Sequence, residues 1–152
     1  MLRLSRKLMF AIEAIVDIAY HASATPVQSK DIAMRQDIPR RYLEQVLQQL
    51  VRKGALRGVR GPRGGYRLAR ERRGVTLGQI TRIVAVLEDA RDPVESSTSS
   101  QLGRKVLGPI WQELQDEAIA KLEEISIEDL CHRARDSGVE GGNQLVEVEF
   151  AI

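Results

Sequence analysis

The feature that most constrains the fold is the regular apolar pattern between residues 40 and 52. Apolar residues recur there three and four positions apart, which predicts one buried helix face of Leu43, Val46, Leu47, Leu50 and Val51, joined by Tyr42. The opposite face carries side chains that suit base edges and phosphates, namely Arg40, Arg41, Glu44, Gln45, Gln48, Gln49 and Arg52. Pro39 suits the first turn, and Lys53-Gly54 supplies a basic last turn and a glycine stop. An amphipathic helix with a solvated face would show the same pattern, so this helix alone leaves DNA recognition open.

The segment that follows predicts a β-hairpin. Residues 55–59 and 66–69 are expected to form two short strands, joined by Gly61-Pro62-Arg63-Gly64-Gly65. Arginine occupies positions 57, 60, 63, 67, 70, 72 and 73. A short helix over residues 30–36, capped by Ser29, precedes the patterned helix, and this order is the plan of a winged helix-turn-helix. A surface hairpin with solubilising arginines is the alternative, whereas a P-loop is excluded because no Lys-Ser or Lys-Thr pair follows the glycines.

The charge is distributed very unevenly along the chain. Residues 1–75 contain 16 Lys and Arg against 6 Asp and Glu, a net charge of +10, and residues 76–152 contain 7 against 15, a net charge of −8. The two halves together give the overall +2 of the 152-residue chain. A basic half indicates a polyanionic partner, for which double-stranded DNA is the leading candidate and an anionic membrane the rival.

The rest of the chain is expected to be mainly helical. Ser5 can cap a helix ending near His21, with Glu13 and Asp17 exposed and a buried face of Leu8, Ile12, Ile15, Ile18 and Ala19. Thr76 can cap a helix over residues 77–87, and Ser126 one that ends near residue 135. A longer helix is expected from Arg104 or Pro109 to Glu124, with an apolar stripe of Ile110, Trp111, Leu114, Ala118 and Leu122. Because one helix outside a winged domain has too little to pack on, we expect it to pair with its twin in a homodimer.

These elements suggest four parts. They are a winged helix-turn-helix domain over residues 1–87, a polar linker over 88–103, dimerisation helices over 104–136 and a tail over 137–152. The end of the tail alternates apolar and polar residues and is expected to be a strand, without an evident function. The expected fold class is therefore mainly α with a small β wing, a winged helix-turn-helix plus a long dimerisation helix.

Several motifs resemble the Rrf2 family of bacterial transcription regulators, which includes IscR-, NsrR- and CymR-like members. The most specific is Arg60-Gly61-Pro62-Arg63-Gly64-Gly65-Tyr66; others are Leu2-Arg3-Leu4-Ser5, Asp31-Ile32-Ala33, Arg41-Tyr42-Leu43-Glu44-Gln45, Leu50-Val51-Arg52-Lys53-Gly54 and Ser126-Ile127-Glu128-Asp129-Leu130. The resemblance covers about residues 1–135 and implies a homodimer whose third helix enters the major groove and whose wing enters the minor groove. It assigns base selection to Glu44 and minor-groove contact to Arg60. The DNA-binding residues expected in all are Arg3, Lys7, Arg40, Arg41, Glu44, Gln45, Arg60 and Arg63.

The chain departs from the cluster-binding members of that family. Those members carry three cysteines and a fourth ligand between the wing and the long helix, where a gap-free alignment places Pro93, Ser99, Lys105 and Gly108. An acidic ligand that some relatives supply from the first helix would fall near Met9, so no iron–sulfur cluster and no other cofactor or metal is expected. The single cysteine, Cys131, is expected to be a buried or half-buried helix residue. A redox thiol, able to form an intersubunit disulfide, is the alternative.

The leading hypothesis is a homodimeric, sequence-specific DNA-binding transcriptional regulator that acts as a repressor and needs no iron–sulfur cluster. Its signal could be a small-molecule effector, a partner enzyme or nothing. The alternatives are a regulatory interaction module that docks a metabolic enzyme, or a thiol-redox sensor through Cys131. Catalysis is not expected, because two His and one Cys form no catalytic constellation. A cytoplasmic location without membrane contact is expected, because no run is long enough to span a bilayer and Glu13 and Asp17 interrupt the one signal-like stretch.

Overall fold

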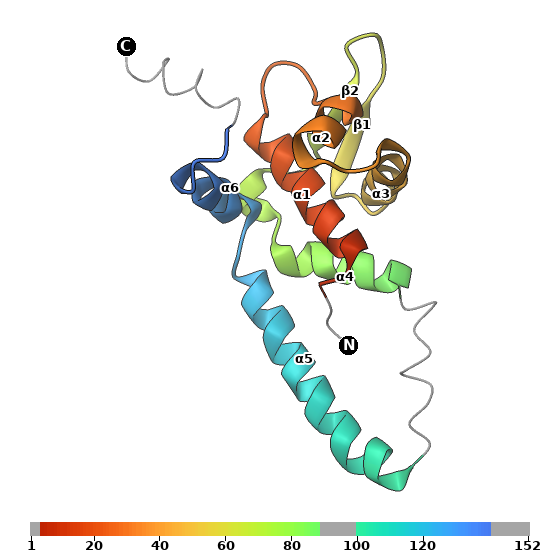
Figure 1. Ribbon diagram of the computed structural model, residues 1–152. Helices are drawn as coiled ribbons and strands as arrows, with labels where there is room; N and C mark the ends of the chain where they lie inside the picture. Colours follow the sequence, from red (N-terminus) through yellow and green to blue (C-terminus); the bar gives the residue numbers. More distant parts are fainter. Residues whose placement is uncertain (1–3, 89–99, 141–152) are drawn as a thin grey trace.

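The computed structural model describes residues 4–88 and 100–140 and is mostly helical, with one two-stranded antiparallel sheet. Five helices and the sheet form a compact head, and the long helix α5 extends away from it (Figure 1). None of the helices in these two ranges is long and apolar enough to cross a bilayer. The elements are α1 (Arg6–Tyr20), α2 (Ser29–Gln36), α3 (Arg40–Arg52), β1 (Leu56–Val59), β2 (Gly65–Leu68), the 3-10 turn η1 (Arg72–Gly74), α4 (Leu77–Glu88), the π-helical segment η3 (Gly103–Leu107), α5 (Gly108–Glu123) and α6 (Ile127–Asp136).

Helix α1 is the centre of the head. Ser5 caps it as expected, since its side chain accepts a 3.1 Å hydrogen bond from the Leu8 amide. The helix contacts α2, α3, β2, α4 and α6. Its buried face includes Ala11 and Ala14, whose small side chains allow neighbouring elements to approach closely, and Ile15 and Ile18. Each large aliphatic side chain buried in this way contributes about 1.5–3 kcal/mol to folding.

The expected helix-turn-helix is present in α2 and α3. The first of these helices begins one residue earlier than expected, so its N-cap is Gln28 rather than Ser29, and that side chain makes no capping bond. Asp37 takes the left-handed conformation (φ 51°) that ends α2 and turns the chain toward α3. Leu43, Val46, Leu47 and Leu50 of the predicted apolar stripe of α3 are buried, whereas Val51 is half-buried and Tyr42 is exposed. Gly54 with φ 81° follows the C-cap residue Lys53.

The hairpin forms in the expected place and requires its glycines. Leu56 pairs with Leu68 and Val59 with Gly65. A further antiparallel bridge joins Val27, in the loop before α2, to Tyr66 through backbone bonds of 3.0 and 2.8 Å. A Cβ atom on Gly65 would overlap the carbonyl oxygen of Val27, and one on Gly64 that of Val59. Only glycine therefore fits where the loop and the hairpin meet.

The expectation that Glu13 and Asp17 of α1 are exposed is wrong, because Asp17 is buried and Glu13 is half-buried. Its carboxylate accepts bonds of 2.9 and 2.8 Å from the Arg35 guanidinium and one of 2.8 Å from the Gln36 amide, both at the end of α2. His21 adds a ring nitrogen 3.6 Å from the same carboxylate. These donors replace the water that the carboxylate loses on burial, and the Asp17–Arg35 ion pair joins α1 to α2. Glu13 is half-buried, and this burial raises the pKa of its carboxyl.

Helix α5 forms as expected, but the first part of its apolar stripe is not covered within one chain, whereas Ala118 and Leu122 farther along are half-buried. Ile110, Trp111 and Leu114 are 46, 54 and 55% exposed, and no residue of α5 is buried.

After α5 the chain returns to the head, where α6 packs on α1 and contributes the fully buried Ile127 and Cys131 to the core. The expected capping box at Ser126 is confirmed by reciprocal bonds with Asp129 of 2.9 and 3.1 Å. Most of the expected linker and the predicted C-terminal strand lie outside the described residues.

Candidate nucleic-acid interface

The exposed face of α3 presents most of the side chains that the sequence predicted for it; the exception is Gln49, which is half-buried. Arg40, Arg41, Glu44 and Gln45 are all exposed, while Leu43 and Leu47 fix the opposite face in the core. Arg40 and Glu44 lie one turn apart with their charged atoms 3.4 Å apart. An exposed pair of this kind contributes at most about 1 kcal/mol, so either side chain can leave it for another partner at little cost.

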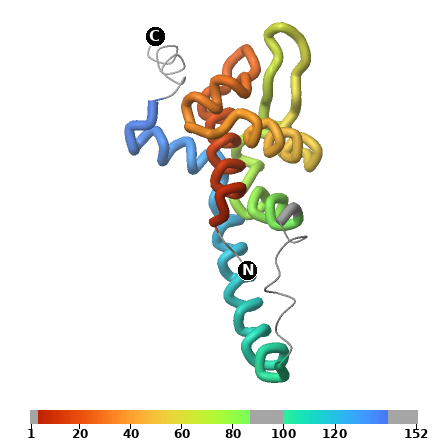
Figure 2. The backbone as a smooth tube through the Cα atoms, turned by 45° about the vertical axis from the view of Figure 1, so that its right-hand side comes forward, coloured from red at the N-terminus to blue at the C-terminus, as the bar shows by residue number. Residues whose placement is uncertain are grey.

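The hairpin carries two exposed arginines, Arg60 and Arg63, at its turn. Figures 1 and 2 place α2, α3 and this hairpin at one end of the molecule and the start of α5 at the other. The hairpin is held against the head by the bridge at Val27 and by Arg67, whose guanidinium donates to the carbonyl oxygens of Ser23 and Ala24. Arg67 thus has a structural role, which the run of arginines in the sequence did not reveal.

Glu44 also lies near the base of the wing. Burial raises the pKa of the Tyr66 phenol, and the negative charge of Glu44 adds to the rise because it disfavours a phenolate nearby. Glu44 of α3 therefore lies close enough to Tyr66 of β2 for its charge to affect the phenol.

The predicted contacts from α1 are only partly described. Lys7 is half-buried in the first turns of α1, and Arg3 lies outside the described residues. The ring of Phe10, one turn after Lys7, packs edge-on against that of Tyr42 in α3, with centroids 5.4 Å apart. The start of α1 therefore lies beside the first turn of α3, which carries Arg40 and Arg41.

The arrangement of α2, α3 and the hairpin is that of a known class of DNA-binding proteins. Two helices joined by a tight turn, the second with an exposed polar and cationic face, are followed by a basic two-stranded wing, which together form a winged helix-turn-helix of the kind that binds DNA. The Rrf2 family, described as an iron-dependent transcriptional regulator, matches residues 4–133. The chain belongs to this family of DNA-binding transcriptional regulators.

Individual relatives agree with this assignment. The chain is 32% identical over 141 residues to the HTH-type transcriptional regulator IscR of Escherichia coli O1:K1 / APEC. This match covers 92% of the chain and 86% of the relative. Among solved structures it is similar to IscR from T. potens, with a TM-score of 0.73, 29% identity and coverage of 95% of this chain and 96% of the other. It is also similar to CymR (YrzC), the global cysteine regulator of B. subtilis, with a TM-score of 0.69, 28% identity and coverage of 88% and 98%.

At the two expected cluster-ligand positions that the structure describes, the residues do not fit the iron that the family description names. Lys105 in η3 and Gly108 at the start of α5 stand at two expected cluster-ligand positions, and neither can supply a thiolate or another ligand for iron. Pro93 and Ser99 lie outside the described residues. No group of three or more His, Cys, Asp or Glu within residues 4–88 and 100–140 is placed to hold a metal ion.

Cys131, the single thiol, is fully buried in α6. Burial raises the pKa of this thiol, although the nearby charge of Arg72 acts in the opposite direction. A buried thiol with a raised pKa is a poor nucleophile at neutral pH, because the reactive form is the thiolate. The geometry therefore favours the structural interpretation of Cys131 over the redox interpretation.

Proposed function

We propose that the protein is a homodimeric, sequence-specific DNA-binding repressor that requires no iron–sulfur cluster. The observation that carries the proposal is the position of the two candidate DNA-contacting surfaces. The exposed face of α3 and the hairpin turn share one end of the molecule, and the start of α5, which carries exposed apolar side chains, lies at the other end. One surface can hold DNA while the other holds a second copy of the chain.

The proposed contacts follow from the chemistry of the exposed side chains. Arg40, Arg41, Glu44 and Gln45 enter the major groove, where arginine suits guanine, glutamine suits adenine and a carboxylate accepts from cytosine N4. Arg60 and Arg63 enter the adjacent minor groove, whose narrow form attracts guanidinium groups. Lys7 and Arg3 contact phosphates and set the position of the protein on the duplex. Domain boundaries follow the same plan, with DNA binding in residues 1–87 and dimerisation through the helices of 104–136.

The dimer is supported by the exposure of α5. Three of its large apolar side chains, Ile110, Trp111 and Leu114, lie within five residues of each other and are about half exposed in the single chain. A contiguous exposed apolar surface on a polar molecule marks an interaction site. Two winged heads joined through such helices would occupy two half-sites of a near-palindrome, and a protein bound there would block access to the same DNA.

Selection of bound sequences from a random DNA library tests the proposal. The selected site is expected to be a near-palindrome with half-sites separated by about 10 bp or a multiple of it. Affinity should fall steeply with salt, because each phosphate contact releases counterions. A single asymmetric half-site, or affinity independent of salt, would contradict a dimer that reads DNA through these surfaces.

The absence of a cluster requirement has its own test. Protein purified without oxygen is expected to be colourless, to lack stoichiometric iron and sulfide, and to bind the selected site. A brown protein that carries iron and sulfide would overturn this part of the proposal, and it would leave the DNA-binding assignment intact.

A further inference from the structure

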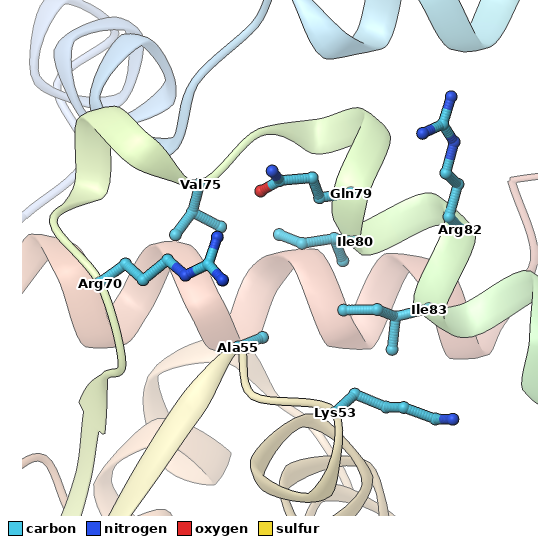
Figure 3. A pocket seen from close by; sticks show the side chains of 8 residues that line it. All are labelled: Lys53, Ala55, Arg70, Val75, Gln79, Ile80, Arg82 and Ile83. Carbon is cyan, nitrogen blue, oxygen red and sulfur yellow. The ribbon is translucent and has the colours of Figure 1, made fainter.

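A pocket of about 260 Å³ lies between α4 and the rest of the head, outside the proposed DNA-contacting surfaces. Its lining comes from four elements, the end of α3, the start of β1, the segment after β2 and helix α4 (Figure 3). The lining residues are Lys53, Ala55, Arg70, Val75, Gln79, Ile80, Arg82 and Ile83. The volume is just below the range of about 300–1,000 Å³ that is usual for ligand sites, so the pocket suits a small molecule.

The lining combines an apolar wall with cationic groups. Ala55, Val75 and Ile80 are buried and supply the wall. Figure 3 shows the Arg70 guanidinium reaching inward between Val75 and Ala55, with Lys53 along the α3 edge. Neither Lys53 nor Arg70 has a carboxylate partner among residues 4–88 and 100–140. Two cations without counter-charges beside an apolar wall match a ligand with an anionic group on a compact apolar body.

The pocket also lies beside the contact between α4 and α5. Arg82 at its rim forms a 2.6 Å ion pair with Glu123 at the end of α5, and α4 approaches that point so closely that a Cβ on Gly78 would overlap the Glu123 side chain. The opposite side of the pocket is formed by Lys53 at the end of α3 and by Ala55, just before β1 of the wing. A molecule that bridges Lys53 to α4 would therefore connect the end of α3 to the helix that contacts α5.

We infer that this pocket binds a small organic anion, a carboxylate on a short apolar or aromatic body, and that its occupancy alters the angle between α4–α5 and the rest of the head. Anion binding is a property of the free protein and does not depend on DNA binding. The effect on the angle rests on the proposed function, because it is measured as a change in affinity for the selected DNA site.

Calorimetric titration of the free protein tests the binding site. Benzoate is the probe, and benzamide, which has nearly the same shape without the charge, is its control. We expect benzoate to bind with a Kd in the range of about 10 µM to about 1 mM, and benzamide at least about tenfold more weakly. Equal affinity for the two probes, or no heat from benzoate at millimolar concentrations, would overturn the inference.

Variants locate the binding. Lys53→Gln with Arg70→Gln removes both free cations at exposed positions and should weaken benzoate binding about tenfold or more. The control, Arg133→Gln, removes an exposed arginine on α6 and should leave the titration unchanged. If the control lost as much affinity as the double variant, benzoate would be responding to net charge and the assigned site would be wrong.

The coupling is tested separately on the operator. Saturating benzoate should change the affinity of the wild type for its selected DNA site at least about threefold in either direction, and should leave that of the Lys53→Gln, Arg70→Gln variant unchanged. Calorimetric binding without any effect on DNA would overturn the coupling and keep the site. Failure to select any DNA site would instead contradict the proposed function, and it would leave the titration result standing.

Discussion

Replacing Arg35 with alanine tests whether the buried charge of Asp17 holds α1 and α2 together. The Asp17 side chain is 0% exposed and receives two hydrogen bonds from the Arg35 guanidinium. Removing one partner of a buried ion pair costs about 3–5 kcal/mol, because the remaining charge loses its compensation. Here Gln36 keeps its bond to Asp17, and Arg35 is itself 30% exposed. We therefore expect Arg35→Ala to lower the free energy of unfolding by about 2–3 kcal/mol.

Replacing the other partner of the ion pair, Asp17, should lower the free energy of unfolding by less. Asp17→Asn keeps the shape of the side chain and leaves Arg35, whose head can turn toward water because it is partly exposed already. The expected loss is about 1–2 kcal/mol. The double variant should be more stable than the sum of the two losses predicts, by about 1 kcal/mol or more, because the second change removes a group that the first has already left unpaired.

Urea unfolding followed by circular dichroism measures all three values. Protein concentration must be the same throughout, because the stability of an oligomer depends on it. Arg133→Ala, an exposed arginine on α6, is the control and should change stability by no more than about 0.5 kcal/mol. A loss of less than that for Arg35→Ala, or strict additivity in the double variant, would refute the reasoning.

Four further predictions concern the candidate interface, the wing, the long helix and the thiol. Glu44→Ala should relax base preference without lowering nonspecific affinity, whereas Arg60→Ala should weaken specific binding by about 1–3 kcal/mol; equal losses on all sequences, in binding to a randomised set, would contradict these roles. Gly65→Ala should destabilise the fold by about 2 kcal/mol or more in the same urea assay, since its Cβ would overlap a neighbouring carbonyl oxygen, and a neutral result would count against that contact. Trp111→Asp should shift the protein toward monomers in analytical ultracentrifugation, and an unchanged mass would exclude this face from the dimer. The thiol of Cys131 should react with an alkylating reagent much more slowly than in urea-unfolded protein at the same pH, because burial raises its pKa; equal rates would favour the redox interpretation.

Local signals in the sequence were enough for the elements of the DNA-binding head. The spacing of Leu43, Leu47 and Leu50 predicted the buried face of α3, and Ser5 and Ser126 marked helix starts that the structure has. The glycines of the wing predicted the hairpin. Each of these features depends on interactions between residues a few positions apart, or on backbone conformations that only certain residues adopt, so the chain carries the information in short stretches.

The tertiary structure decided what depends on residues far apart in the chain. Asp17 looked exposed because its partners, Arg35 and Gln36, lie 18 and 19 residues later, and only packing of α2 on α1 brings them together. The return of α6 to α1, and the pocket between the end of α3 and α4, arise in the same way. The period of an apolar pattern tells which face of a helix is buried, but it does not tell what covers that face. That choice is made by the free energy of the whole packed chain, in which a buried charge becomes acceptable once distant donors satisfy it.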